Sequence, residues 1–439
     1  MNLAVISMLV LAVVVAIGFI KKVNLGFLAL GAAFILGTLG GLKAKAITGG
    51  FDSSMFVTLV GVTFLFGMAS QNGTLDLFSK KIVALVGKHT VLIPVLMFFL
   101  SAFISAIGPG HIAAGILMTT FAVYLAFEMK INPVTTALFA KLGANAGCAS
   151  PLSLTGVLAK SLTEKQLDRI NAGELKDASG VLTAQLQNYN VGHVFFSTLL
   201  SGFIFTLIIY VATKSYKVKA DNPLKLKDIP KFNRDQILTV IAIIAMVVLC
   251  IGFKLDTGLT AFVAAAILIL LGAADEKKAI KGIPWGTLVF ICGVGTLISV
   301  INTLGGISLI SDFLTSLMGP KTATPILAAT SGILSWVSST TGVVMPALFP
   351  IASEVVVQFP TLNYMELIAA ITATSFAAAI SPLSTGGAII MSSISASKET
   401  SNEENNIMFR NLFLLSVANV LVNVLLSALG VFSLGGVFY

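Results

Sequence analysis

The sequence contains few charged residues and none of the common motifs of enzymes. Asp, Glu, Lys and Arg make up 10% of its 439 residues, whereas soluble domains carry about 25%. No GxxxxGK[ST] loop occurs, so the chain shows no sign of an ATP motor. There is also no HExxH zinc motif, no Ser-His-Asp context and no pair of carboxylates within an apolar run. We therefore expect an integral membrane protein that is not an enzyme.

Cysteine is scarce as well. Cys148, Cys250 and Cys292 are scattered over apolar runs and form no CxxC pair, which argues against a disulfide framework and a cysteine-based metal site. The net charge of +8 comes from 27 basic and 19 acidic residues. Basic residues of membrane proteins gather in cytoplasmic loops, so the charge does not predict a nucleic-acid partner.

Long apolar runs dominate the remainder, with 56% hydrophobic residues. A bilayer span needs roughly 20 such residues. The first run lacks a basic start and a cleavage site, so it reads as a span and not as a signal peptide. The runs predict an all-α polytopic protein embedded in the lipid bilayer; they cover residues 2–20, 25–42, 54–69, 91–127, 134–159, 191–213, 237–253, 258–273, 285–302, 325–358, 364–395 and 411–439.

One phrase occurs twice. Residues 150–156 read SPLSLTG, and residues 381–387 read SPLSTGG, 231 positions later. Residues 45–49 and 278–282 (KAITG and KAIKG) match at a shift of 233. A near-constant shift over such a length indicates a duplication. Because proline, glycine and hydroxyl residues end helices, the phrase predicts one broken transmembrane helix in each half, over 134–159 and 364–395.

Two further runs are too long for a single span. Run 91–127 breaks at Gly108-Pro109-Gly110, and run 325–358 breaks at residues 338–342. Each predicts a re-entrant helical hairpin whose tip lies inside the membrane, where irregular backbone must meet protein or water. The alternative is a pair of kinked full spans.

These features divide the chain into a first span (1–22), repeat 1 (23–213), a linker (214–236) and repeat 2 (237–439). The linker is basic and is therefore expected in the cytoplasm, with the protein in a bacterial inner (plasma) membrane. An odd number of spans in each half would insert the halves in opposite senses, as two inverted structural repeats.

The two hairpin tips and two breaks would then meet near the membrane midplane. Helix N-termini there suit a carboxylate, and freed carbonyls and hydroxyls suit Na⁺ as a coupling ion. No other cofactor is expected. The alternative is that the hydroxyls only cap helix ends. The candidate residues for substrate and ion binding are Gly108, Pro109, Gly110, His111, Asn145, Ser150, Pro151, Ser153, Thr155, Ser339, Thr340, Thr341, Gly342, Ser381, Pro382, Ser384 and Thr385.

Lys141 is a candidate charge partner for an anion. It lies eight residues into the run that begins at Pro133, which places it roughly 12 Å deep. Charge at that depth is costly and indicates function. Asn145, four residues later, would share its helical face. The alternative is a lysine that snorkels to the headgroups, and for His111 the alternative is a structural role.

At these residues the chain resembles the ion transporter superfamily that includes the divalent anion:sodium symporters of the INDY type. Residues 339–341 (STT) are similar to the Ser-Asn-Thr at that family's second hairpin tip, whereas Gly108-Pro109-Gly110 departs from the first. The SPxSxxG breaks are most similar to malonate and dicarboxylate carriers of the MatC type. The resemblance implies a homodimer that binds a small carboxylate between the tips and moves it by an elevator-like motion.

Three functions remain open. The first is a secondary active symporter of malonate or a C4-dicarboxylate, coupled to Na⁺ or protons. The second is a cation/proton antiporter of the same superfamily, which needs an intramembrane carboxylate; Asp312, Glu354 and Glu366 all look peripheral. The third is a non-transporting membrane receptor or scaffold, which would not need two matched hairpins.

Overall fold

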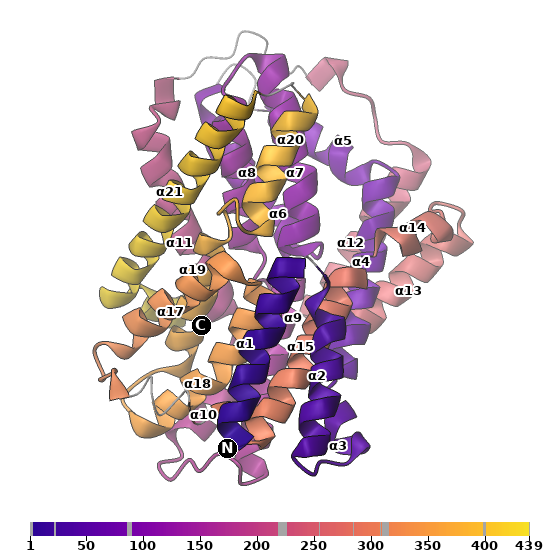
Figure 1. Cartoon of the computed structure of the whole chain (residues 1–439). Helices are drawn as coiled ribbons and strands as arrows, with labels where there is room; N and C mark the ends of the chain where they lie inside the picture. The colour runs from indigo at the N-terminus through magenta and orange to yellow at the C-terminus, as the bar shows by residue number, and fades with distance from the viewer. Residues whose placement is uncertain are drawn as a thin grey trace.

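A computed structural model of the chain describes residues 3–21, 23–85, 90–217, 226–253, 255–283, 285–307, 309, 316–397 and 401–438. Over these residues the regular structure is helical throughout, and no strand occurs (Figure 1). This confirms the predicted all-α class. Asp312 and residues 218–225 of the predicted linker lie outside the described residues.

Some helices of the first half begin directly after an asparagine whose side chain caps them. Asn24 Oδ1 accepts from the Gly26 amide at 2.8 Å, and Asn132 Oδ1 accepts from the Thr135 amide at 3.1 Å, directly before Pro133. The helices are α1 (Leu3–Lys21), α2 (Leu25–Leu39), α3 (Ala44–Thr48), α4 (Ser53–Gln71), α5 (Thr74–Leu85), η1 (Thr90–Leu92), α6 (Ile93–Ala106), α7 (Gly110–Met129), α8 (Pro133–Gly147), α9 (Leu154–Asn171), α10 (Val181–Gln187) and α11 (Val191–Ala212).

The second half follows the same rules. Asn233 and Gln236 form a capping box, and Asn363 caps the helix that corresponds to the one capped by Asn132. The elements are η2 (Ser215–Lys217), η3 (Leu226–Asp228), α12 (Arg234–Gly252), α13 (Thr257–Leu270), α14 (Glu276–Gly282), α15 (Trp285–Thr303), α17 (Ala323–Val337), η4 (Thr340–Val344), α18 (Met345–Gln358), α19 (Tyr364–Ala378), α20 (Thr385–Ser397), α21 (Asn402–Ala428) and η5 (Val431–Phe438).

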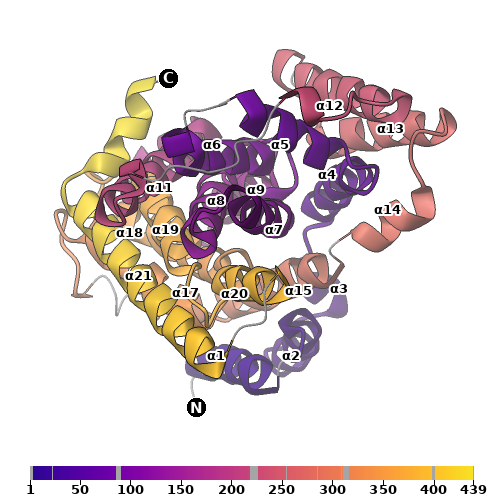
Figure 2. The ribbon, with the colours of Figure 1, turned by 90° about the horizontal axis from the view of Figure 1, so that it is seen from above.

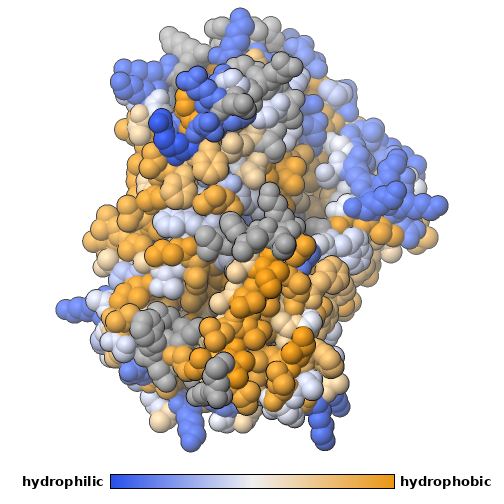
Figure 3. All heavy atoms as spheres, in the orientation of Figure 1, coloured by the Kyte–Doolittle hydropathy of each residue, from blue (hydrophilic) through white to orange (hydrophobic). Residues whose placement is uncertain are grey.

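Several helices are suited to cross a membrane. Within the described ranges, four are long and apolar enough: Gly110–Met129, Val191–Ala212, Thr340–Gln358 and Glu403–Ala428. Helices α4 and α5 together pass the same test but are bent by 66° at their junction. Apolar side chains cover much of the surface, for example Phe27, Phe34 and Ile35 of α2, each at least 60% exposed. Figure 3 shows this apolar surface over the lower part of the molecule, as expected for an integral membrane protein.

The two halves pack crosswise. Helix α2 lies against α15, and α4 lies against α13. A Cβ added to Gly293 would lie 2.3 Å from the Gly26 carbonyl oxygen, and one added to Gly61 would lie 2.4 Å from the Gly258 carbonyl oxygen. Gly293 lies 232 residues after Gly61, and Gly258 lies 232 residues after Gly26. The same close helix contact therefore occurs twice, with the halves exchanged.

The helices of each long apolar run also pack against the other half of the chain. Helices α6–α8 lie in the upper part of Figure 1, and α17 and α18 lie in the lower part. Helix α7 of the first half packs on α20 of the second, and α18 of the second half packs on α9 of the first. Seen from above, α7, α8 and α9 lie near the centre, between α21 on one side and α12–α14 on the other (Figure 2).

Helix also occurs in residues 160–188, a polar stretch that lies between two of the predicted apolar runs. Helix α9 runs on to Asn171, and α10 follows. The polar residues form an amphipathic helix: Lys160 pairs with Glu164 at 3.7 Å on the exposed face. Leu162, Thr163 and Gln166 are buried on the other face, which packs on α18.

Candidate functional site

The two helix breaks share one backbone design. Between α8 and α9, Ser150 Oγ accepts a hydrogen bond from the Leu152 amide at 3.3 Å. Between α19 and α20, Ser381 Oγ accepts from the Leu383 amide at 3.2 Å. Both pairs of residues are 231 positions apart. The first serine of each SPLS phrase therefore turns the chain directly after the helix ends.

The second serine of each phrase binds a carbonyl that the break has freed. Ser153 Oγ donates to the Cys148 carbonyl, and Ser384 Oγ donates to the Ala379 carbonyl at 2.6 Å. These bonds match the capping alternative for Ser153 and Ser384. Their hydroxyl hydrogens are committed to the backbone, so a carboxylate cannot accept from them without breaking these bonds. Their oxygens retain lone pairs that can face a cation.

The carbonyl end of α19 is held by four side chains from three helices, α8, α17 and α21. Each of its last four carbonyls accepts one bond from a buried polar group, at 2.8–3.2 Å. These donor–acceptor pairs are Ser335–Ser375, Asn145–Phe376, Asn419–Ala377 and Ser416–Ala378. The break is thus fully supported on its C-terminal side, as a helix end inside a membrane requires.

Lys141 lies inside the protein, which excludes the snorkelling alternative. Its side chain is 1% exposed, and Nζ donates to the carbonyl of His111 at 2.8 Å. A Cβ added to Gly115 of α7 would lie 2.7 Å from Nζ, and one added to Gly386 of α20 would lie 2.8 Å from Cε. No ion pair to Lys141 exists among the described residues. The ammonium is therefore held between the first hairpin and the second break without a counter-charge.

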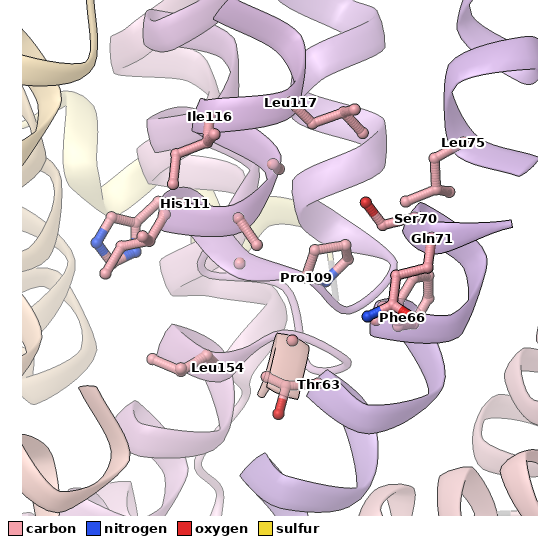
Figure 4. A pocket seen from close by; sticks show the side chains of 16 residues that line it. Thr63, Phe66, Ser70, Gln71, Leu75, Pro109, His111, Ile116, Leu117 and Leu154 are labelled. Atoms are coloured by element: carbon pink, nitrogen blue, oxygen red, sulfur yellow. The ribbon is translucent and has the colours of Figure 1, made fainter. Parts of the chain in front are cut away.

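The first hairpin tip borders a cavity of about 230 Å³ beside α4 and α5. Figure 4 shows Pro109 facing this space opposite Ser70 and Gln71. The ring of His111 points away from both, toward α19, where its centroid is 4.9 Å from that of Phe376. His111 Nδ1 is buried and has no hydrogen-bond partner among the described residues, so it is a polar group available to a ligand.

The second tip is a π-helical turn, η4, instead of a simple loop. Ser339 Oγ accepts from the Gly342 amide at 3.2 Å, and Thr340 Oγ1 lies 3.0 Å from Ser335 Oγ. Thr341 is 1% exposed. Through Ser335 this tip is linked to the carbonyl end of α19, and so to the second break.

The breaks differ in exposure. Thr155 is completely buried, and its Oγ1 has no partner within the described part of the chain, whereas Thr385, the second-half residue of similar position, is exposed, and Pro382 is half-buried. Pro151 is exposed and lines a polar cavity of about 760 Å³ between α4, α9 and α13. The candidate residues therefore do not form one cluster: some line the two cavities, His111 contacts Lys141, and residues 339–342 form the second tip.

Asn145 is directed differently from Lys141. It was expected to share the face of Lys141, but its amide nitrogen donates to Phe376 at 3.1 Å, whereas Lys141 reaches α7 and α20. Both side chains are at least 97% buried, so each can reach only the helices that it packs against. Asn145 packs against α19, whereas Lys141 packs against α7 and α20.

Sequence reasoning missed an ion pair. Arg169 Nη2 lies 2.9 Å from Glu354 Oε1, with side chains 10% and 13% exposed, and Arg169 Nη1 donates to Gln166 at 2.9 Å. Glu354 was expected at the periphery; it lies four residues before the end of α18, where the extension of α9 brings Arg169 onto it. The sequence did offer one indication of this ion pair, namely a basic residue in the first half, Arg169, and an acidic residue in the second half, Glu354.

The described residues contain no group of three His, Cys, Asp or Glu side chains that could hold a metal ion. A bound cation would therefore depend on neutral oxygens. Such ligands suit a hard monovalent ion better than a divalent ion, which usually requires carboxylates.

Known proteins resemble this chain both in sequence and in fold. Residues 1–148 match the family model described as the N-terminus of the dicarboxylate carrier protein MatC. The fold is similar to the crystal structure of the YdaH transporter of Alcanivorax borkumensis, with a TM-score of 0.57, 13% identity, and coverage of 88% of this chain and 87% of that one. No curated protein matches in sequence. Residues 1–148 therefore resemble the N-terminal part of the MatC dicarboxylate carrier family, and the chain as a whole shares the fold of a transporter.

Proposed function

We propose that the protein is a secondary active transporter of a small dicarboxylate, of the malonate or C4-dicarboxylate class, coupled to a gradient of Na⁺ or protons. The MatC match supports the substrate class, and the fold match supports transport. On the same proposal it acts as a homodimer in a bacterial inner membrane, with the basic linker 214–236 in the cytoplasm.

The observation that carries the proposal is the uncompensated ammonium of Lys141. Its only hydrogen-bond partner among the described residues is the His111 carbonyl. A buried charge without a counter-charge is expensive, and a substrate carboxylate would supply that counter-charge. Helix α20 begins at Thr385, next to Gly386, so its N-terminal amides add partial positive charge on the same side.

Two cavities along α4 support alternating access. The 760 Å³ cavity contacts α4 at Asp52, Ser54 and Thr58, and the 230 Å³ cavity contacts it between Thr63 and Gln71. Both border the first break, one at Pro151 and the other at Leu154. A hairpin-and-break unit that slides along α4 would open one cavity as it closes the other, which is the elevator-type motion that we propose.

The antiporter receives no support from a free carboxylate. Glu354 is paired with Arg169, and Glu366 lies in the first turn of α19, where Thr324 Oγ1 is 3.3 Å from its Oε1. Both carboxylates have structural partners, whereas Lys141 has none of opposite charge.

Uptake into proteoliposomes tests the proposal. Purified protein is reconstituted, and labelled malonate, succinate and fumarate are added under an inward Na⁺ gradient, an inward proton gradient or neither. We expect gradient-dependent accumulation of at least one dicarboxylate, and none of a matched amide. Accumulation of no carboxylate under either gradient, by protein that is folded and correctly inserted, would contradict the proposal.

A further inference from the structure

A small cavity lined with oxygen atoms lies on the side of the breaks that faces α11 and α21. It measures about 10 Å³, close to the space that one water molecule requires. Its polar lining comes from Asn145 of α8, Thr198 and Ser201 of α11, and Asn419 and Asn423 of α21. No lining residue is charged.

Two amide oxygens at this cavity lack partners. Asn145 is 3% exposed and Asn423 is 1% exposed, and Oδ1 of each has no hydrogen-bond partner in the described part of the chain. Their nitrogens are occupied: Asn145 Nδ2 donates to Phe376, and Asn423 Nδ2 donates to Asn419. Burial of two unsatisfied acceptors is costly, which indicates that something positive or a hydrogen-bond donor occupies the space between them.

The hydroxyls add further oxygen ligands. Thr198 Oγ1 donates to the Val194 carbonyl at 2.7 Å, and Ser201 Oγ donates to the Thr198 carbonyl at 3.2 Å. With their hydrogens committed to the backbone, both oxygens offer lone pairs to the cavity. The lining is therefore rich in acceptors.

The helix ends favour a cation at this place. Asn145 and Ala146 belong to the last turn of α8, and Phe376 and Ala377 belong to the last turn of α19. The C-terminal end of a helix carries partial negative charge. Two such ends meet at one cavity, and half-helix C-terminal ends are the places where transporters coordinate coupling ions.

The geometry points to a Na⁺ site at this cavity, made by Asn145, Asn423, Thr198 and Ser201. Its size excludes a large ligand, and the lack of carboxylates disfavours a divalent cation. The inference deepens the proposed function, because it identifies a site for the coupling ion that is separate from the hairpin tips and from Lys141.

Trp336 allows a direct test. Its ring packs in the cluster that contains Ala377, and its Nε1 donates to Ser416 at 2.8 Å. The chain has two tryptophans, so in a Trp285→Phe variant Trp336 is the one that remains. NaCl is titrated into purified protein at constant ionic strength, with choline chloride as the replacement and KCl as a comparison. The fluorescence of Trp336 and the thermal unfolding midpoint are both recorded.

We expect both signals to saturate with Na⁺ and to respond weakly to K⁺. Asn423→Leu removes one oxygen ligand at nearly constant volume and should raise the Na⁺ midpoint about tenfold or more, given the strength of polar contacts to ions. Ser201→Ala should raise the Na⁺ midpoint less, and it replaces Asn423→Leu in the test if that variant does not fold. Ser427→Ala deletes a buried hydroxyl of the same helix α21 away from the cavity, and should leave the midpoint unchanged.

Two results would overturn the inference. One is a wild-type midpoint in both Asn423→Leu and Ser201→Ala. The other is an absence of any Na⁺ response in the wild type, with Asn423→Leu stabilised equally in Na⁺ and choline, as expected if the cavity holds water. Dicarboxylate uptake is measured separately: uptake without the Na⁺ response removes this inference alone, and a Na⁺ response without uptake of any carboxylate removes the proposed function alone.

Discussion

Asn145 of α8 donates a hydrogen bond to the carbonyl of Phe376 of α19 at 3.1 Å, and the two residues are 231 positions apart. The same shift separates the two SPLS phrases. Equivalent residues of two repeats touch each other only where the axis that relates the repeats passes between them. The contact is consistent with two repeats related by an approximate two-fold axis near the ends of α8 and α19; that the repeats are inverted in the membrane stays a prediction.

The repeats differ where charge matters. The residue 231 positions after Lys141 is Thr372, which is fully buried and donates to the Ile368 carbonyl at 2.7 Å. One half of the protein therefore supplies an ammonium and the other half supplies a hydroxyl that is already satisfied. If the protein carries a dicarboxylate as proposed, this asymmetry gives it one buried ammonium that can pair with the anion, and not two.

Lys141→Arg should fail to replace the lysine. Gly115 and Gly386 lie so close to Nζ and Cε that an added Cβ would be 2.7 or 2.8 Å away, which leaves no space for a planar guanidinium. We expect dicarboxylate uptake to fall at least as far as in Lys141→Gln, with lower thermal stability than in that variant. Uptake at the wild-type rate by Lys141→Arg would show that the packing around Nζ is looser than described.

Ser384→Ala should cost stability. The hydroxyl donates to the Ala379 carbonyl at 2.6 Å, so its loss leaves a carbonyl of the second break without this partner. We expect the free energy of unfolding to fall by about 1–2 kcal/mol, measured as a lower thermal midpoint. Thr385→Ala is the control, because Thr385 is exposed at the same break. Equal midpoints for the two variants would argue against a capping role for Ser384.

Separating Arg169 from Glu354 should destabilise the contact of α9 with α18. The pair is 2.9 Å apart and largely buried, so Glu354→Met alone leaves an uncompensated charge and should cost about 3 kcal/mol. The double variant Arg169→Met/Glu354→Met should recover much of that loss. A double-mutant cycle of thermal midpoints tests this, and strictly additive losses would show that the pair contributes no coupling.

Na⁺ and dicarboxylate should strengthen each other's binding. Lys141 lies one helical turn before Asn145 on α8, so its charge opposes a cation at the Asn145–Asn423 cavity until a carboxylate neutralises it. We expect saturating malonate to lower the Na⁺ midpoint, and Na⁺ to tighten malonate binding by the same factor, as linkage requires. Lys141→Gln should abolish the coupling while it retains Na⁺ binding. Independent midpoints in the wild type would contradict this coupling.

The sequence predicted the large features because they depend on local patterns. The SPLS phrases interrupt helices because proline lacks the amide hydrogen that a helix interior needs, and the structure has breaks at residues 148–153 and 379–384. Both long runs are interrupted where the sequence indicated, at residues 107–109 and 338–339, and their form as re-entrant hairpins stays a prediction. Depth alone pointed to Lys141 as a buried charge, because about 12 Å of helix separates it from the start of its run.

The rest depended on tertiary contacts. Nothing in the order of residues shows that Asn145 turns toward Phe376 while Lys141, four residues earlier, turns toward Gly386. Residues 160–171 are polar and lie outside the predicted apolar runs, and the helix there is recognisable only from its buried face against α18. Asn419 and Asn423 stand four residues apart in the final apolar run, a spacing that places two polar groups on one helix face. The sequence does not show that Asn419 donates to Ala377 of α19 or that Asn145 of α8 lines the same cavity.

The most direct test of the account is whether Lys141 recognises a carboxylate. Binding of malonate and of its monoamide, which keeps the shape and loses one charge, is measured by isothermal titration in saturating Na⁺ for the wild type and Lys141→Gln. The account predicts that the wild type binds malonate about tenfold or more tightly than the monoamide, and that Lys141→Gln binds the two with nearly equal and weak affinity. Undiminished preference for malonate in Lys141→Gln would contradict the account.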